Sequence, residues 1–175
     1  APWWILLGGV LFFNLFNSAR YTAGPFFFAS VIGGEAQLKI FSFEFLFYAG
    51  IFFAVGEVAN MAGVAMTPWI TRKIGKKSTF MYSLILLIGL SILFFFIPLT
   101  SGGYWLMMLM QVVISIITGI VSPLVWSMYA DISDYAELKF NTASTGLIFS
   151  SSSMAQKFGG AIGGSAVTAI LAAVG

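Results

Sequence analysis

The sequence predicts an all-α integral membrane protein with five transmembrane helices. Hydrophobic residues make up 59% of the 175 residues and charged residues only 8%, whereas an ordinary soluble domain has about 25% charged residues. Aromatic residues reach 17%, which excludes a disordered chain, because such chains contain few large apolar side chains. The period-two alternation typical of a transmembrane barrel is absent. The spans are therefore expected to be helices, which satisfy their own backbone hydrogen bonds in lipid.

Five apolar windows lie between polar breaks, each close to the length of about 20 residues that crosses a hydrocarbon core of about 30 Å. They run roughly over residues 3–28, 46–70, 78–98, 104–130 and 146–174. The chain starts without Met, and its last window is still apolar where the sequence ends. We therefore expect residues 1–175 to be a truncated piece of a longer protein.

Small residues and prolines predict how these helices pack and bend. The glycines of residues 159–164 form two overlapping GxxxG spacings, which let a neighbouring helix approach closely. Pro25 and the Ser122-Pro123 pair with Gly119 are expected to interrupt two of the helices.

Positive charge in the connections predicts the orientation, because cytoplasmic connections are enriched in Lys and Arg. The second connection contains four basic residues, the fourth adds Lys139, and the third, at residues 99–103, contains none. We therefore place the second and fourth connections in the cytoplasm, with Ala1 cytoplasmic and Gly175 external. The four basic residues are Arg72, Lys73, Lys76 and Lys77. On the simplest interpretation they set the orientation and have no other role.

Several classes of function are excluded by composition. The chain has no Cys and no His, so it lacks a disulfide framework, a Cys/His metal site, a thiol nucleophile and a Ser-His-Asp triad. The net charge of +2 rests on eight basic residues in a hydrophobic chain, which form no continuous surface for nucleic acid. We expect no enzyme activity, no resident metal or cofactor and no nucleic-acid partner.

Three charged residues fall inside the apolar windows, namely Arg20, Glu57 and Lys157. A charge at the centre of a membrane helix costs about 2.5 to 3.5 kcal/mol on insertion scales, so it usually faces a protein interior or an aqueous cavity. We predict a functional site within the membrane that consists of Lys157, Ser153, Glu57, Asn60, Arg20 and Asn17. The alternatives are that Arg20 snorkels to the outer headgroups and that Glu57 is a protonated structural group. A purely structural role is least expected for Lys157, which lies too deep to snorkel.

An acidic motif follows the fourth window. Asp131, Asp134 and Glu137 repeat at intervals of three residues, which places them along one face of a helical turn. Uncompensated carboxylates would repel one another, so basic residues of the second connection or of a missing partner are expected to face them. Such ion pairs can form in one conformation and break in another. The predicted cytoplasmic gate consists of Asp131, Asp134, Tyr135, Glu137, Arg72, Lys73, Lys76 and Lys77.

The motif Ala-Asp-x-x-Asp-Tyr-x-Glu-x-Lys at Ala130–Lys139 is followed by Gly146–Ser150 and Gln156–Gly159. In these segments the sequence resembles the carboxyl-terminal half of the glycoside-pentoside-hexuronide:cation symporters, a melibiose permease-like family of the major facilitator superfamily. Pro68–Lys77 is similar to the family's basic connection between helices eight and nine. The resemblance covers the whole chain in hydropathy and is specific at the residue level from about Ser122 to Gly164.

The resemblance implies that residues 1–175 are the truncated carboxyl-terminal helical half of a transporter, with five helices that correspond to helices seven to eleven of twelve. It implies symport of a sugar or glycoside with Na⁺, Li⁺ or H⁺ by alternating access, in the inner membrane of a bacterium. We expect the six polar residues named above to line the substrate and cation pathway, although the resemblance itself carries over only Lys157 and Ser153. Lys157 would lie close to the cation, and Ser153, one turn away, would be a candidate sugar contact. The acidic motif would belong to the network that closes the cytoplasmic mouth.

Two alternatives stay open. A lysolipid or another solute carried by the same fold would suit the 19 Phe residues. An odd number of helices would also suit a non-transporting scaffold or a vestigial half-gene. The expected partners are the substrate, the lipid bilayer, and the missing amino-terminal six-helix half and final helix.

Overall fold

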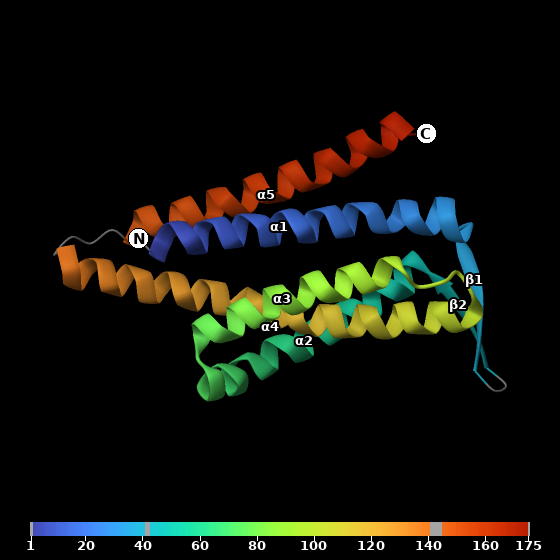
Figure 1. Cartoon of the computed structure of the whole chain (residues 1–175), viewed down its shortest axis with the longest axis horizontal. Helices are drawn as coiled ribbons and strands as arrows, with labels where there is room; N and C mark the ends of the chain where they lie inside the picture. The colour runs from blue at the N-terminus through green and yellow to red at the C-terminus, as the bar shows by residue number, and fades with distance from the viewer. Residues whose placement is uncertain (1, 41–42, 141–144, 175) are drawn as a thin grey trace. The chain divides into compact units, whose positions relative to one another are not determined.

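The computed structural model describes residues 2–40, 43–140 and 145–174 (Figure 1). The elements in these residues are α1 Pro2–Phe27, the π-helical turn η1 Phe28–Ile32, β1 Glu35–Ile40, β2 Phe43–Tyr48, α2 Ala49–Ile74, α3 Lys76–Phe95, α4 Ser101–Phe140 and α5 Thr145–Val174. Within the described residues, α2, α3 and α4 are long and apolar enough to cross a membrane. Crossing by α1 and α5 stays a prediction. The prediction that Ala1 is cytoplasmic and Gly175 external concerns two residues that lie outside the described residues.

The mainly helical class is confirmed, but the first connection folds into a β-hairpin that the all-α prediction did not include. Its strands are antiparallel, with Glu35 opposite Tyr48 and Ile40 opposite Phe43. The second window was expected to begin as a helix near residue 46, whereas α2 begins at Ala49. The physical reason is composition, because the aromatic residues of β2 favour a strand over a helix.

The fourth helix is longer than its apolar window. It continues to Phe140, about ten residues beyond the predicted end. At 1.5 Å per residue, its 40 residues make a helix about 60 Å long, twice the thickness of the hydrocarbon core. The acidic motif therefore lies on α4 itself and not in a connection.

The predicted interruptions at two prolines do not end either helix, and bending of the helices there stays a prediction. Pro25 and Pro123 lie inside α1 and α4. Membrane helices tolerate Pro when local adjustments satisfy the backbone groups that it frees. In α1 the adjustment follows directly, because the helix passes into the π-helical turn at Phe28.

The chain divides into two compact units, which are described separately. The first unit consists of Ala1–Phe26 and Val125–Gly175, and the second consists of Phe27–Leu124. The helix α4 contributes residues to both.

In the first unit, α1 and α5 lie side by side (Figure 1) with their backbones in contact. One face of α5 is buried at every third or fourth residue, namely Ile148, Ser152, Ala155, Gly159 and Gly163. A Cβ atom on Gly159 would lie 2.6 Å from the Leu11 carbonyl oxygen, and one on Gly163 would lie 2.5 Å from that of Leu15. The Ser18 hydroxyl donates a 2.5 Å hydrogen bond to the carbonyl oxygen of Gly160. The GxxxG spacing of residues 159 and 163 thus forms the predicted close helix contact.

In the second unit, an aromatic cluster joins the hairpin to the ends of the helices. Its buried members are Phe28, Phe47, Phe52, Ile97 and Met107. Phe47 of β2 is fully buried, and its ring stacks on Tyr104 of α4 with the centroids 5.3 Å apart. The hairpin is therefore held by side-chain contacts between segments that are distant in the sequence.

Also in the second unit, α2 packs against α4 through a face that is buried at Phe52, Gly56, Ala59, Gly63 and Thr67. A Cβ atom on Gly63 would collide with the carbonyl oxygen of Ile116, and one on Gly119 would collide with that of Asn60. The Thr67 hydroxyl lies 3.4 Å from the carbonyl oxygen of Ile120. This face determines which residues of α2 are turned away from α4.

Candidate functional site

Lys157 and Ser153 lie one turn apart on a flank of α5 that is turned away from α1. With about 100° between successive helix residues, Lys157 is rotated by roughly 120° to 160° from Gly163 and Gly159. Its side chain is exposed. The Ser153 hydroxyl donates a 3.0 Å hydrogen bond to the carbonyl oxygen of Phe149 in its own helix, which leaves its oxygen able to accept. This flank presents a cation and an acceptor away from the two glycines that meet carbonyl oxygens of α1.

Arg20 and Asn17 lie on a different flank of the same unit. Both are half-buried on α1, where they continue a stripe of buried residues formed by Leu6, Val10 and Phe13. The Asn17 amide donates a 3.0 Å hydrogen bond to the Phe13 carbonyl oxygen. Its Oδ1 atom is buried without a hydrogen-bond partner among the described residues. The structure therefore does not bring this pair onto the same flank as Lys157.

Glu57 and Asn60 belong to α2 in the second unit. Asn60 is half-buried at the edge of the face that packs on α4, where Gly119 meets its carbonyl oxygen. Glu57 lies one turn earlier and is exposed. Because residues three apart are neighbours on a helix surface, the two side chains share one flank of α2, as the spacing predicts.

The acidic motif is exposed on the last turns of α4, where it consists of Asp131, Asp134, Tyr135 and Glu137. Ser133, about 160° around the helix from Asp131 but only about 40° from Glu137 at 100° per residue, is buried, and its hydroxyl lies 2.7 Å from that of Thr145 at the start of α5. The Lys139 ammonium group donates a 3.1 Å hydrogen bond to the Tyr135 hydroxyl. A helix fixed on one face to α5 therefore presents its carboxylates as an ordered row on another.

The basic residues of the predicted gate surround the turn between α2 and α3, where Gly75 has a φ of 81°. Arg72 and Lys73 end α2, and Lys76 and Lys77 begin α3. The Lys73 ammonium group lies 3.9 Å from the ring centroid of Trp69. This turn belongs to the second unit and the acidic row to the first, so an ion pair between them stays a prediction.

Two buried hydroxyl groups were not singled out by the sequence. Tyr129 of α4 and Ser152 of α5 are both 0% exposed. Neither hydroxyl has a hydrogen-bond partner of good geometry among the described residues. In the same unit the rings of Trp126 and Phe149 stack with their centroids 6.0 Å apart and an interplanar angle of 11°. The available signal was the position of Tyr129 directly before the acidic motif.

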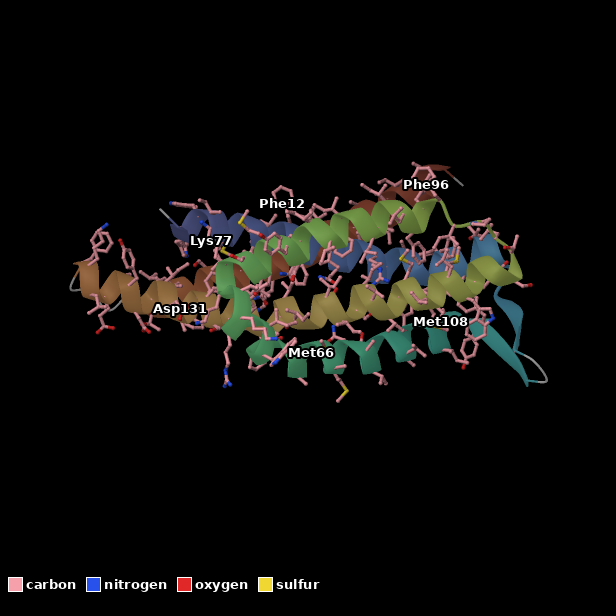
Figure 2. The ribbon with its side chains drawn as sticks, turned by 60° about the horizontal axis from the view of Figure 1, so that its bottom comes forward. Phe12, Met66, Lys77, Phe96, Met108 and Asp131 are labelled. Carbon is pink, nitrogen blue, oxygen red and sulfur yellow. The ribbon has the colours of Figure 1, made fainter. Side chains whose placement is uncertain are left out.

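The chemistry offered by these side chains is that of charges and hydroxyl groups. In the part of the chain that the structure describes, no three His, Cys, Asp or Glu side chains come together. A shallow depression of about 440 Å³ on α4 is lined by Trp105, Leu106, Met108, Leu109 and Val112, of which Met108 is labelled in Figure 2. These apolar side chains offer no set of converging polar groups to a ligand.

Comparison with known proteins identifies the class. The family described as MFS/sugar transport protein matches residues 1–175, and the chain belongs to this family of multi-pass membrane transporters. The match confirms the resemblance to the glycoside-pentoside-hexuronide:cation symporters. The proteins of this family and the relatives described next are transporters and not enzymes.

Two relatives agree with this assignment. The isoprimeverose transporter of Lactiplantibacillus pentosus is 30% identical over 150 residues, which cover 81% of this chain and 30% of that transporter. The glucuronide carrier protein homolog of Escherichia coli (strain K12) is 32% identical over 126 residues, which cover 70% of this chain and 27% of that carrier. The chain thus spans about 30% of the length of the curated relatives it matches. No solved structure matches the chain.

Proposed function

We propose that residues 1–175 are part of a secondary active transporter that moves a sugar or glycoside together with Na⁺, Li⁺ or H⁺ by alternating access. The observation that carries the proposal is the match of the sugar transport family to the whole chain. The two relatives are named for isoprimeverose and for a glucuronide, which supports a sugar over a lysolipid as the substrate. In this proposal the helices correspond to helices seven to eleven of a twelve-helix carrier.

Lys157 is the residue that we assign to the cation pathway. A lysine at this depth costs about 2.5 to 3.5 kcal/mol unless it meets an opposite charge or water. In the complete carrier we place the Lys157 ammonium group beside carboxylates or a water-filled pathway. An ammonium group beside carboxylates can stand in for the coupling cation, so a bound cation and Lys157 would compete for the same charges. Ser153, one turn away, supplies a hydrogen-bond acceptor for a sugar hydroxyl.

The other polar residues of the membrane region have supporting roles in this proposal. Arg20 and Asn17 of α1, with Glu57 and Asn60 of α2, line the same pathway in the complete carrier. The acidic row of α4 and the basic turn between α2 and α3 form the cytoplasmic gate, which closes when the ion pairs form. Coupling requires that sugar and cation bind preferentially to the same conformation.

The test is sugar uptake by the complete carrier in vesicles, measured with and without an imposed Na⁺, Li⁺ or H⁺ gradient. Lys157→Ala is expected to lower gradient-driven uptake by about ten-fold or more, a change that corresponds to ~1.4 kcal/mol of differential binding. Lys157→Arg, which keeps the charge, is expected to retain part of the gradient dependence. Sugar binding without a gradient is expected to change less than the driven uptake.

Thr168→Val is the matched control on the same flank of α5. Among the described residues, the Thr168 hydroxyl donates its hydrogen bonds to carbonyl oxygens of its own helix, at Gly164 and Ser165, and this variant should keep wild-type gradient dependence. Full gradient dependence in Lys157→Ala would remove Lys157 from the cation pathway. Uptake of lysolipids but not of sugars by the wild type would overturn the proposed substrate.

A further inference from the structure

One flank of α2 is apolar along its length and ends in an aromatic-cationic pair. At intervals of three or four residues it carries Ile51, Val55, Val58, Ala62, Met66, Trp69 and Lys73. Val58, Met66 and Trp69 are 70%, 41% and 59% exposed, respectively, and Met66 is labelled on α2 in Figure 2. Exposed apolar residues in one row on a membrane helix are suited to contact with acyl chains.

This flank differs from the flank that carries the predicted pathway residues. Arg72 is rotated by about 60° from Glu57, whereas Lys73 is rotated from it by about 160°, at 100° per residue. Lys73 is also roughly 120° from Thr67, the last buried residue of the face that packs on α4. The row that ends in Lys73 is therefore turned away both from α4 and from Glu57.

The pair at the end of this row has the chemistry of a membrane interface. The Lys73 ammonium group lies 3.9 Å from the centroid of the Trp69 ring, which is within the range of a cation–π contact. Trp residues concentrate at headgroup depth, where their rings are apolar on the face and polar at the edge. The contact with Trp69 leaves the ammonium N–H groups of Lys73 available as hydrogen-bond donors.

The charge of this end of the second unit is not balanced locally. Between Glu57 and Asp131 the sequence contains no acidic residue, and its only charges are the four basic residues around Gly75. Glu57 lies 16 positions before Lys73, or about 24 Å along the helix at 1.5 Å per residue. The neighbouring residues of this segment therefore supply no carboxylate to Lys73, and the position is open to an anion from elsewhere.

We propose that Trp69 and Lys73 form a site for an anionic phospholipid of the cytoplasmic leaflet, with the headgroup phosphate on the Lys73 ammonium group and an acyl chain along the apolar row of α2. In this proposal the basic residues of the turn between α2 and α3 have different roles, although the sequence assigned all of them to the gate. Arg72, on the side of Glu57, and Lys76, which is half-buried in line with Thr79 and Ser83 of α3, remain with the gate. Lys73 neutralises a lipid.

The experiment places the complete protein in phosphatidylcholine vesicles that contain 30% phosphatidylglycerol by composition, roughly the fraction needed to give the surface a negative potential. Two preparations are compared, one with brominated acyl chains on the phosphatidylglycerol and one with brominated acyl chains on the phosphatidylcholine. Bromine quenches tryptophan fluorescence on contact. The contribution of Trp69 is the difference between the wild type and Trp69→Phe. At equal mole fractions of the brominated lipid, quenching should show about a five-fold preference for phosphatidylglycerol. This factor corresponds to the attraction of about 1 kcal/mol between one lysine and an anionic membrane surface.

Lys73→Gln is expected to reduce this preference to about one, and Lys73→Arg is expected to keep it. Arg72→Gln is the matched control, because it removes a neighbouring charge from the other flank, and it should leave the preference within two-fold. Equal quenching by both lipids in the wild type would overturn the proposal, as would loss of the preference in Arg72→Gln but not in Lys73→Gln.

Two further outcomes would show that the row is covered by protein or that the site binds free phosphate instead of a phospholipid. If neither brominated lipid quenches Trp69, another part of the protein covers the row and the lipid site does not exist. If inorganic phosphate abolishes the preference at an ionic strength where NaCl does not, the site takes free phosphate and not the lipid headgroup. A preference that survives phosphate and responds to Lys73→Gln supports the proposal.

Discussion

At the scale of single residues, the Tyr129 and Ser152 hydroxyl groups of the first unit are buried close to each other without a well-aligned hydrogen bond. Both side chains are 0% exposed, and neither hydroxyl has a well-aligned partner among the described residues. A buried hydroxyl without a partner costs about 1 to 3 kcal/mol. By contrast, Ser133 and Thr145 join the same two helices by a 2.7 Å hydrogen bond. In the contact between α4 and α5, the Ser133–Thr145 pair is therefore stabilising, whereas the Tyr129–Ser152 pair is not.

Tyr129→Phe tests this difference. The variant removes one unsatisfied hydroxyl and keeps the ring, so the free energy of unfolding should stay unchanged or rise by up to ~1 kcal/mol. Ser133→Ala, which breaks the bond to Thr145, should lower it by about 1 kcal/mol. The measurement is reversible unfolding of the complete protein in mixed micelles with increasing dodecyl sulfate. A loss of more than ~1 kcal/mol in Tyr129→Phe would mean that the hydroxyl is satisfied, for instance by bound water.

At the scale of the elements, two helix pairs are held at backbone distance by glycine. Gly159 and Gly163 let α5 reach α1, while Gly63 and Gly119 let α2 reach α4. In a membrane, helices gain little from burying apolar surface, so close packing of small residues is a main source of association. Each pair therefore depends on positions where even a methyl group has no room.

Two adjacent glycines of α5 provide a matched test. A Cβ atom on Gly159 would lie 2.6 Å from the Leu11 carbonyl oxygen, whereas one on Gly160 would have no atom within 4 Å. Gly159→Ala should therefore destabilise the protein by about 1 to 3 kcal/mol through overpacking. Gly160→Ala should be neutral or stabilise it by about 0.5 to 1 kcal/mol, because Ala is the better helix former. Equal effects in the same unfolding assay would contradict the close contact of α1 and α5.

These contacts also show how far sequence reasoning reached. The GxxxG spacing predicted a close neighbour for α5, but it did not distinguish residues 159 and 163, where a Cβ atom would collide with backbone carbonyl oxygens of α1, from the second spacing one residue later. The shared flank of Glu57 and Asn60 followed from their separation of three residues, because a helix repeats every 3.6 residues. Local periodicity thus predicted which side chains share a face, but not which partner the face meets.

The hairpin and the length of α4 show what could not be predicted. Phe47 is buried because it stacks on Tyr104, a residue from another element, and no local pattern contains that contact. The end of α4 was predicted from hydropathy, which reports where a helix leaves lipid and not where it stops. The residues at Asp131–Lys139 include Ala, Glu, Leu and Lys, which are good helix formers in water, so the helix continues.

At the scale of the whole molecule, the charge distribution predicts that the two ends of α4 lie on opposite sides of the membrane. Its first turn follows a connection without basic residues, and its last turn contains Lys139 next to the acidic row. The 40 residues of α4, at 1.5 Å per residue, amount to about 60 Å of helix, which exceeds the hydrocarbon thickness of about 30 Å. The positive-inside rule therefore predicts that Ser101 lies outside and Leu138 in the cytoplasm.

Single cysteines at these two positions test the orientation with one helix as its own control. The natural residues 1–175 contain no Cys, so background labelling from this chain is absent once cysteines elsewhere in the complete protein are replaced. Ser101→Cys should react with a membrane-impermeant maleimide on intact cells. Leu138→Cys, at a position that is 89% exposed, should react only after the cells are permeabilised. Reversed labelling would invert the orientation, and labelling of both positions from outside would show that α4 does not cross the membrane.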